Sequence, residues 1–265
     1  MTSITGPTLA TQTRFAIADA YTLTRRNLLI WLKVPAFIAF TIVQPVMFTL
    51  LFRYVFGGAI QTGAPGGYVD YLLPGVIGQT AAFTSFGTAI SLAEELQRGS
   101  IDRLRSMPIA RSAVLLGRLA ADVVRLLVIT LIIVGVGYAV GFRFHDGPGP
   151  AIGMIVLALV LGIATCCVSA FIGLAIKDSE SVQAFGLIWV FPLTFVSSAF
   201  VPVQSMPGWL QAFANNQPIT HMVDAMRALA LGGPMGNHLW AGLLWMLGVL
   251  AVFGPLAVRA YRRAS

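Results

Sequence analysis

The segment AIGMIVLALVLGIATCCVSAFIGLAI, residues 151–176, contains no charged residue. A helix of about 20 consecutive apolar residues crosses the hydrocarbon core of a bilayer, so this run is long enough for a membrane span. The whole chain has the same character, since 57% of its 265 residues are hydrophobic and only 10% are charged. Soluble domains carry about 25% charged residues. The sequence therefore predicts an all-α integral membrane protein.

Five further apolar runs accompany this segment, and together they predict six transmembrane helices. A single transmembrane domain, residues 1–265, is expected to contain them all. Pro192 lies near the middle of the fifth run and is expected to kink that helix, because proline lacks the N–H that continues a helix. The adjacent Cys166 and Cys167 lie inside the fourth run and are interpreted as small packing residues. The expected spans are residues 34–56, 71–93, 119–142, 151–176, 181–201 and 239–258.

Basic residues are distributed unequally between the two sets of loops, and this distribution assigns the sides of the membrane. Short cytoplasmic loops carry more Lys and Arg than external loops do. One set of loops has only Arg143 and Arg227, with Arg53 at its boundary. The other set consists of both termini, residues 94–118 and the turn at Lys177. This set is expected in the cytoplasm. Because the basic residues form no single stripe, the net charge of +7 predicts no nucleic-acid partner. The cytoplasmic set comprises Arg14, Arg25, Arg26, Lys33, Arg98, Arg103, Arg105, Arg111, Arg118, Lys177, Arg259, Arg262 and Arg263.

Residues 202–238 are too long for a simple hairpin and contain two helical patterns. The first begins after Pro207, whose fixed φ suits the start of a helix. The second has apolar residues at helical spacing over residues 219–230 and ends at Gly232. Neither pattern is long enough to cross the membrane, so we expect two short interfacial or re-entrant helices before the last span. The opposite face of the second helix carries either a structural ion-pair ladder or a gate at the external exit, formed by His221, Asp224 and Arg227.

Motifs that carry enzyme chemistry are missing from the sequence. A phosphate-binding P-loop needs GxxxxGK[ST], but neither of the two lysines follows a glycine. The HExxH and GxSxG patterns are missing too. Asp122 is the one acid expected inside a span, near the start of the third, where it can pair with Arg125. The sequence therefore predicts a non-enzymatic protein without a catalytic, cofactor or metal site of its own, and coupling to an ion gradient is not favoured.

The charged segment EELQRGSIDRLRSMPIARSAVLLGR, residues 94–118, is too polar to lie in the hydrocarbon. Its two glutamates continue the second span beyond the membrane, and Gly99 allows a turn. Ile101 and Leu104 then give a short helix an apolar face. Such a helix suits docking into a groove of a partner protein. A solvated loop that contacts lipid headgroups explains the same composition equally well.

At these residues the chain resembles the type-2 class of ABC exporter permeases, in particular the daunorubicin-resistance-like permeases. The corresponding loop of that family has acidic residues, a Gly followed by Ser or Thr, a Leu-Arg pair and a Pro. The resemblance extends to PVQSMPGWLQAFANNQP, residues 202–218, and to AMRAL, residues 225–229. It thus covers nearly the whole chain in order. The matching loop residues are Glu94, Glu95, Gly99, Ser100, Leu104, Arg105 and Pro108.

The resemblance implies a complex of two permease subunits with two separate ABC ATPase subunits, which bind the ATP and Mg. The second permease is either an identical or a similar chain. Residues 1–33 would then include an N-terminal interfacial elbow helix, and residues 94–118 would form a coupling loop that the ATPase moves. The implied ATPase-coupling residues are Glu94, Glu95, Gly99, Ile101, Arg103, Leu104 and Arg105.

The activity implied by the resemblance is export of a hydrophobic or amphipathic drug or lipid across the plasma membrane. A mildly polar stripe on the second span, facing Gln44 of the first, is a candidate translocation path, although small hydroxyl residues also serve to pack membrane helices. Phe83 and Phe86 would face either substrate or lipid. A channel or secondary carrier that works without an ATPase, and an accessory structural subunit, are the alternatives. The candidate path residues are Gln44, Gln79, Thr80, Thr84 and Thr88.

Overall fold

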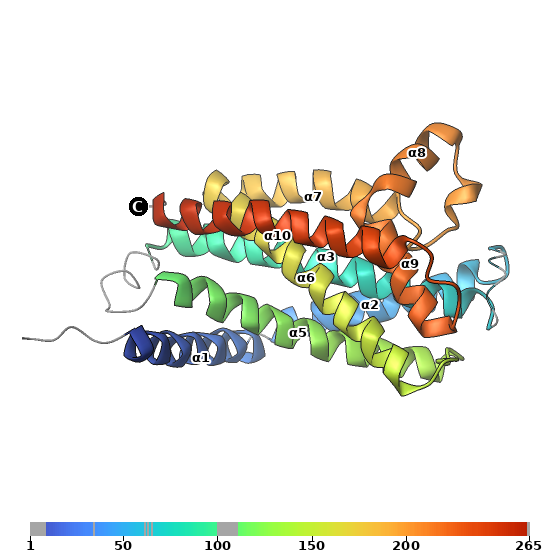
Figure 1. Ribbon diagram of the computed structural model, residues 1–265, viewed down its shortest axis with the longest axis horizontal. Helices are drawn as coiled ribbons and strands as arrows, with labels where there is room; N and C mark the ends of the chain where they lie inside the picture. Colours follow the sequence, from blue (N-terminus) through green and yellow to red (C-terminus); the bar gives the residue numbers. More distant parts are fainter. Residues whose placement is uncertain are drawn as a thin grey trace, which may run out of the picture.

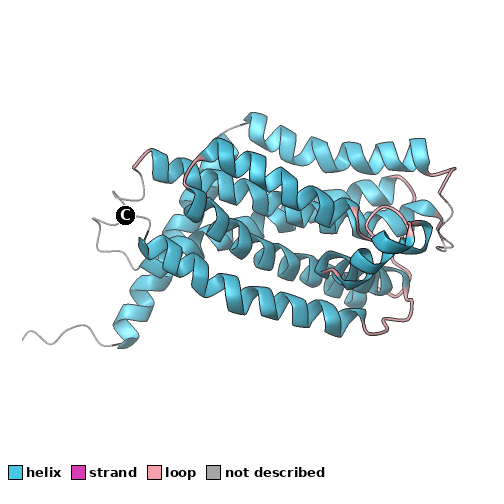
Figure 2. Ribbon diagram, turned by 90° about the horizontal axis from the view of Figure 1, so that it is seen from above, coloured by secondary structure: helices cyan, strands magenta, loops and turns pink. Residues whose placement is uncertain are grey.

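The computed structural model describes residues 9–33, 35–60, 62, 64, 66–99 and 111–263. Every regular element within these ranges is a helix, as Figure 2 shows, and the predicted all-α class is confirmed. The α-helices are α1 (Leu9–Lys33), α2 (Pro35–Leu51), α3 (Tyr68–Gln97), α5 (Arg111–Ala139), α6 (Pro148–Ile176), α7 (Ser179–Phe195), α8 (Gly208–Asn216), α9 (Pro218–Leu231) and α10 (His238–Arg263). A π-helical turn, Phe52–Phe56, extends α2, and a short 3₁₀ turn, Val203–Ser205, precedes α8.

Helices lie at all six predicted spans. By length and composition, four of them can cross a membrane, namely α3, α5, α6 and α10. The apolar helix at the first span is shorter, over Thr41–Phe56, and α7 has 17 residues. At a rise of about 1.5 Å per residue, 17 residues measure roughly 26 Å, slightly less than the hydrocarbon thickness. The count of six spans therefore stays a prediction for α2 and α7.

The helices form an elongated bundle with two distinct ends (Figure 1). The C-terminus, the end of α3 and the turn between α6 and α7 lie at one end. Helices α8 and α9 lie at the other, together with the connection between α5 and α6. The sequence divides the loops into two sets that lie on opposite sides of the membrane, and this grouping agrees with that division. The assignment of the first end to the cytoplasm still rests on its basic residues.

Helix α3 is the centre of the bundle, and residues 68–82 of it are all buried. It packs closely on α6, where a Cβ atom at Gly173 would overlap the carbonyl oxygen of Ala89. At the other end of α3, a Cβ atom at Gly75 would overlap the carbonyl oxygen of Ala199. Small residues let the backbones of membrane helices approach each other in this way. The position of α3 therefore depends on glycines at two of its contacts.

The fifth predicted span differs from the helix that is present. Helix α7 ends at Phe195, so Pro192 lies in its last turn, and the expected position in the middle of the helix is wrong. The kink itself stays a prediction. Residues 196–202 continue as irregular backbone. Ser197 Oγ donates to the carbonyl oxygen of Thr194 at 2.5 Å and accepts the N–H of Ala199 at 3.1 Å. Serine side chains that bond nearby backbone groups compete with helix continuation, which explains the early end of α7.

The two short helices expected before the last span are confirmed as α8 and α9. Helix α9 ends at Gly232 in the left-handed conformation, with φ of 72°, as the sequence predicts. Met222, Val223 and Met226 on its apolar face are completely buried in the main core. The apolar face of α9 therefore packs on protein.

Candidate functional site

A cavity of about 460 Å³ opens between α2, α3 and α7. Its volume is within the ~300–1,000 Å³ of small-molecule sites. Four of the five candidate path residues line it, namely Gln44, Gln79, Thr80 and Thr84. The fifth, Thr88, lies elsewhere and donates to Asp122. The structure therefore brings most of the predicted stripe together around one space, which we call the α2–α3–α7 cavity.

Aromatic rings form the apolar walls of the α2–α3–α7 cavity. Phe83, Phe86 and Phe191 line it, and the rings of Phe83 and Phe191 meet edge to face at 5.5 Å between centroids. Phe86 lies against Gly186 of α7, where a Cβ atom would overlap the ring. Since α7 has no side chain at that position, the phenyl ring fits between α3 and α7. The two phenylalanines considered in the sequence thus contact α7 beside the cavity.

The polar wall of the cavity contains a buried amide side chain. Gln79 is 3% exposed, and among the described residues its Nε2 has no hydrogen-bond partner. Its neighbour Thr80 is bonded within the helix, since its Oγ1 donates to the carbonyl oxygen of Val76 at 2.7 Å. A buried donor without a partner costs about 1–3 kcal/mol. Gln79 therefore differs from Thr80, whose hydroxyl group is bonded within its own helix.

An ion pair lies inside the bundle beside the cavity. Arg125 Nη2 donates to Asp122 Oδ1 at 2.5 Å, so the predicted pair is confirmed. Thr88 donates to the other carboxylate oxygen at 2.6 Å, and Cys166 Sγ lies 3.8 Å from the same oxygen. Asp122 is 6% exposed and lies three turns into α5, because that helix begins earlier than expected, at Arg111. The carboxylate thus has donors from α3, α5 and α6 around it.

Arg125 connects this ion pair to two cavities. Its side chain lines the α2–α3–α7 cavity and also a second cavity of about 280 Å³ between α1, α3 and α5. Its Nη2 also donates to the carbonyl oxygen of Thr84 at 3.4 Å. Its Nε is buried and has no partner within the described ranges. The guanidinium therefore lies between a space inside the bundle and a space near the basic end of the molecule.

Two of the predicted coupling residues form ion pairs at the end of α3. Glu95 accepts from Arg118 of α5 at 2.9 Å, and Glu94 accepts from Arg98 at 3.1 Å. Gly99 follows with φ of 65°, so the expected turn is confirmed. The other predicted coupling residues, Ile101, Arg103, Leu104 and Arg105, lie outside the described residues, and so does the docking helix expected there.

The turn between α6 and α7 meets the same end of α3, a contact that sequence reasoning missed. Asp178 caps α7 by accepting the N–H of Ser181 at 2.8 Å. The bonds from Ser181 hold the pKa of Asp178 below its usual range. Gln97 Nε2 donates to the same side chain at 3.1 Å. The cap is recognisable in the sequence from an aspartate just before an apolar run, whereas the bond to Gln97 requires the fold.

The three residues considered for an external gate form a polar cluster at the other end of the bundle. Arg227 donates to Asp224 and to the carbonyl oxygen of Ser198, the latter at 2.7 Å. Its guanidinium also lies 3.6 Å from the ring centroid of Tyr71. His221 Nδ1 lies 3.3 Å from Nδ1 of His238 on α10. The cluster thus connects α9 to α3, to α10 and to the irregular segment after α7.

Burial and the neighbouring His238 lower the pKa of His221, and the carboxylate of Asp224 acts in the opposite direction. His238 Nδ1 itself lies 3.8 Å from Asp224. These influences together favour the neutral form of His221. Among the described residues, no group of three His, Cys, Asp or Glu side chains is arranged to hold a metal ion.

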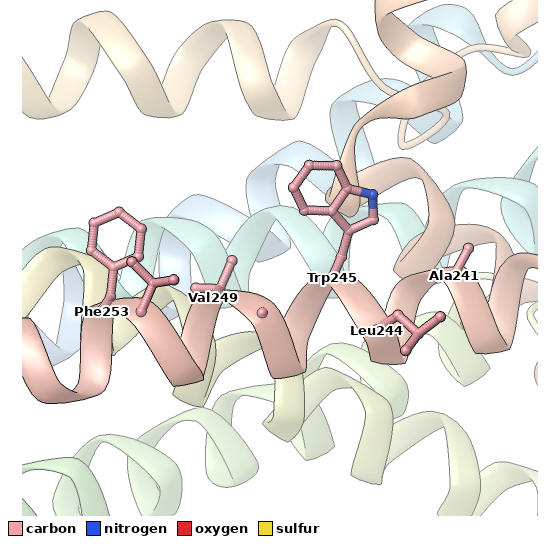
Figure 3. A pocket seen from close by; sticks show the side chains of 7 residues that line it. Ala241, Leu244, Trp245, Val249 and Phe253 are labelled. Atoms are coloured by element: carbon pink, nitrogen blue, oxygen red, sulfur yellow. The ribbon is translucent and has the colours of Figure 1, made fainter.

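A larger space, about 530 Å³, lies along the outer face of α10 (Figure 3). It is lined by apolar side chains of this one helix, including Leu244, Trp245, Val249 and Phe253. Leu244 is 67% exposed and Trp245 is 47% exposed. Apolar side chains on an outer face of a membrane helix contact lipid or another helix. None of the candidate path residues borders this groove, so the α2–α3–α7 cavity is the better candidate site.

Comparisons with known proteins place this geometry in context. Residues 19–231 match the ABC-2 type transporter family. The chain is 33% identical over 224 residues to the daunorubicin resistance ABC transporter permease protein DrrB1 of Streptomyces coeruleorubidus, covering 84% of this chain and 79% of that protein. It is 32% identical over 254 residues to the probable doxorubicin resistance ABC transporter permease protein DrrC of Mycobacterium tuberculosis, covering 95% and 91%. It is also 30% identical over 207 residues to ABC transporter G family member 20 of Dictyostelium discoideum, covering 73% of this chain and 27% of that protein.

Proposed function

The chain belongs to the ABC-2 type transporter family and is the membrane subunit of an ABC exporter, and from this premise we propose what it carries and how it is driven. The proposed cargo is a hydrophobic or amphipathic molecule, a drug or a lipid. It moves out of the cytoplasm or the inner leaflet of the plasma membrane. The names of two relatives, which refer to daunorubicin and doxorubicin resistance, support a drug-like cargo.

The observation that carries the cargo proposal is the α2–α3–α7 cavity. Three phenylalanines supply apolar walls, while Gln44, Gln79 and Thr84 supply polar groups at the same space. Ligand sites commonly combine a mostly apolar lining with a few polar groups that orient the ligand. In this proposal the cavity is one section of the translocation path, and residues 1–265 form one permease domain with six spans and both termini in the cytoplasm.

A separate ABC ATPase is the proposed source of energy, because the chain has no P-loop of its own. The ATPase binds ATP and Mg, and the functional unit contains a second copy of this permease or a similar one. The proposed docking segment is residues 94–118, with Glu94, Glu95 and Gly99 at its start. The polar cluster of His221, Asp224 and Arg227 would close the external end of the path.

The docking proposal is tested by co-expressing the chain with a P-loop ATPase from its genomic neighbourhood and purifying both through a tag on the permease. Gly99→Pro is expected to release the ATPase, because proline requires φ of about −65° and the position has φ of 65°. Gly141→Pro is the matched control, since Gly141 also has a positive φ, of 107°, and lies in the connection between α5 and α6.

We expect Gly99→Pro to lower the amount of ATPase bound per folded permease at least several-fold. Gly141→Pro is expected to leave this amount unchanged. Crosslinking from residues 100–106 is expected to reach the ATPase. If crosslinks from this segment reached only lipid and the ATPase stayed bound to Gly99→Pro, the docking proposal would be wrong. A stable, transporting protein that never binds an ATPase would instead support a channel or a secondary carrier.

A further inference from the structure

We propose that the second cavity, about 280 Å³ between α1, α3 and α5, binds the headgroup of an anionic phospholipid of the cytoplasmic leaflet, and that Arg26 and Arg98 hold its phosphate. We call this space the α1–α3–α5 cavity. The proposal goes beyond the proposed function, since neither the cargo nor the ATPase enters it. It relies only on the proposed orientation, in which this end of the bundle faces the cytoplasm.

Contacts between the three helices fix the walls of the α1–α3–α5 cavity. Helix α1 lies alongside α5 (Figure 1), and Thr24 Oγ1 donates to the carbonyl oxygen of Gly117 at 3.0 Å. A Cβ atom at Gly117 would lie only 2.9 Å from the carbonyl oxygen of Ala20, so the two helices approach closely. Arg118 of α5 then pairs with Glu95 of α3 at 2.9 Å. The cavity is therefore a defined space inside the helix packing.

The described lining of this cavity has one positive charge more than it has negative charges. Each of its carboxylates forms an ion pair with one of its arginines. The remaining arginine, Arg26, has no acidic partner among the described residues. A ligand with one negative charge would balance the lining. The charged residues of the lining are Arg26, Arg98, Arg118 and Arg125, and Glu94, Glu95 and Asp122.

Two of the arginines are accessible to a ligand. Arg26 is exposed, and the side chain of Arg98 is 73% exposed. Arg118 and Arg125, by contrast, are only 14% and 15% exposed and remain bound to their carboxylates. The planar guanidinium group matches the geometry of phosphate oxygens and binds them through two parallel hydrogen bonds. Arg26 and Arg98 are therefore the donors that a phosphate can reach.

Apolar residues of α1 indicate that the phosphate belongs to a lipid. Leu28, Ile30 and Trp31 line the same cavity, and tryptophan is enriched where a membrane meets water. Leu29, Ile30 and Leu32 are 39%, 49% and 57% exposed, so they can contact acyl chains. The cavity is too small for a whole phospholipid, so it would hold the headgroup alone. Basic pockets between helices on the cytoplasmic side are typical sites for lipid headgroups.

The existing ion pairs favour an anionic headgroup over a zwitterionic one. Glu94 accepts from Arg98 at 3.1 Å, and Glu95 accepts from Arg118 at 2.9 Å. The ammonium group of a zwitterionic lipid would have to displace an arginine from one of these carboxylates. A headgroup with a phosphate and uncharged hydroxyl groups, such as phosphatidylglycerol, avoids this competition.

The test measures lipid binding to the full-length chain, purified in detergent with the co-expressed ATPase, by native mass spectrometry. The probes are phosphatidylglycerol, phosphatidylcholine with the same acyl chains, and glycerophosphoglycerol, which is the headgroup without acyl chains. Phosphatidylglycerol is expected to bind about fivefold more tightly than phosphatidylcholine, because one basic residue contributes about 1 kcal/mol to the attraction of an anionic lipid. An excess of glycerophosphoglycerol is expected to leave phosphatidylglycerol bound.

Two variants with matched controls assign the preference to this cavity. Arg26→Gln is expected to remove most of it, whereas Arg25→Gln should retain it, because Arg25 is an equally exposed neighbour outside the described lining. Glu94→Gln releases Arg98 and is expected to tighten the binding of phosphatidylglycerol about fivefold, a gain that cannot come from misfolding. Glu180→Gln is its control, since Glu180 is an exposed acid in the first turn of α7.

Equal binding of phosphatidylglycerol and phosphatidylcholine would overturn the proposal. Displacement of the lipid by glycerophosphoglycerol would overturn it too, because the site would then recognise a soluble phosphate. Equal losses in Arg25→Gln and Arg26→Gln would mean that lipid is attracted by a basic surface and not by this cavity. The proposed function is judged separately, since loss of the ATPase from the sample contradicts that function and leaves the lipid preference to be measured on the permease.

Discussion

At the scale of single residues, the least expected feature is a charged pair inside the bundle. Asp122 and Arg125 lie three residues apart on α5, and Thr88 of α3 donates to the same carboxylate. Charged side chains inside membrane proteins are costly and usually pair with one another. Their pairing balances the charge of the guanidinium, so Arg125 can border a cavity without attracting anions. The pair thus joins α3 and α5 beside the cavity.

Removal of one member of this pair is expected to destabilise the protein more than removal of both. Asp122→Asn or Arg125→Gln leaves a buried, unpaired charge or donor, which typically costs about 3–5 kcal/mol. The double variant removes both charges and should lose less than the sum of the single variants. Thermal unfolding in nanodiscs measures these differences.

Glu94→Gln is the control for this cycle, because the pair that it disrupts is exposed, at 41% for Glu94 and 73% for Arg98. Exposed ion pairs contribute about 0–1 kcal/mol, so a small effect is expected there. Strictly additive losses at Asp122 and Arg125 would mean that the two side chains do not act as a pair.

At the scale of helices, the arrangement depends on how closely α6 and the segment after α7 approach α3. Gly173 meets the backbone of Ala89, and Gly75 meets the backbone of Ala199. Tyr71 then bonds through its hydroxyl group to the carbonyl oxygen of Ser198 at 2.9 Å. Close backbone contact at both ends and bonds to the irregular segment hold α3 in place between α6 and α7.

Gly173→Ala is expected to destabilise the protein by about 1–3 kcal/mol, because the new Cβ would overlap the carbonyl oxygen of Ala89 and overpacking forces the helices apart. Gly135→Ala is the matched control within α5, since nothing lies within 4 Å of a Cβ atom there. Alanine stabilises a helix interior relative to glycine by up to about 1 kcal/mol, so the control should be neutral or slightly more stable. Similar melting temperatures for the two variants would contradict close packing of α3 on α6.

The sequence predicted the helices well, because long apolar runs specify them directly. The run of residues 151–176 corresponds to α6, and Gly232 ends α9 as expected. The end of α7 was not predictable, because the sequence stays apolar to Val201 while serine side chains bond the backbone instead of continuing the helix. The lack of a partner for Gln79 Nε2 among the described residues was also not predictable, because hydrogen-bond partners depend on which helices meet. Sequence reasoning thus predicted a polar stripe most of which lines one cavity, but not the hydrogen-bonding state of its members.

At the scale of the whole molecule, the two ends of the bundle have different functions in the proposed ATP-driven transport cycle. At the basic end, Gln97 connects the end of α3 to the turn at Asp178, so a force on the segment after α3 would reach α7. Both helices line the α2–α3–α7 cavity. At the far end, Arg227 holds α9 to α3 and to the carbonyl oxygen of Ser198. ATP-driven movement of the docking segment would therefore change the cavity between two connected ends.

The most direct test of this account is the accessibility of the cavity in the complex with its ATPase. Thr84→Cys, in a background of Cys166→Ala and Cys167→Ala, places one thiol in the cavity, and Ser205→Cys gives an exposed control just before α8. The rate of maleimide labelling is measured with and without ATP and vanadate. The account predicts a change of several-fold at Thr84→Cys that needs both ATP and the ATPase, and no change at Ser205→Cys. The account would be contradicted if the labelling rate at Thr84→Cys did not change on addition of ATP to an intact complex that hydrolyses ATP.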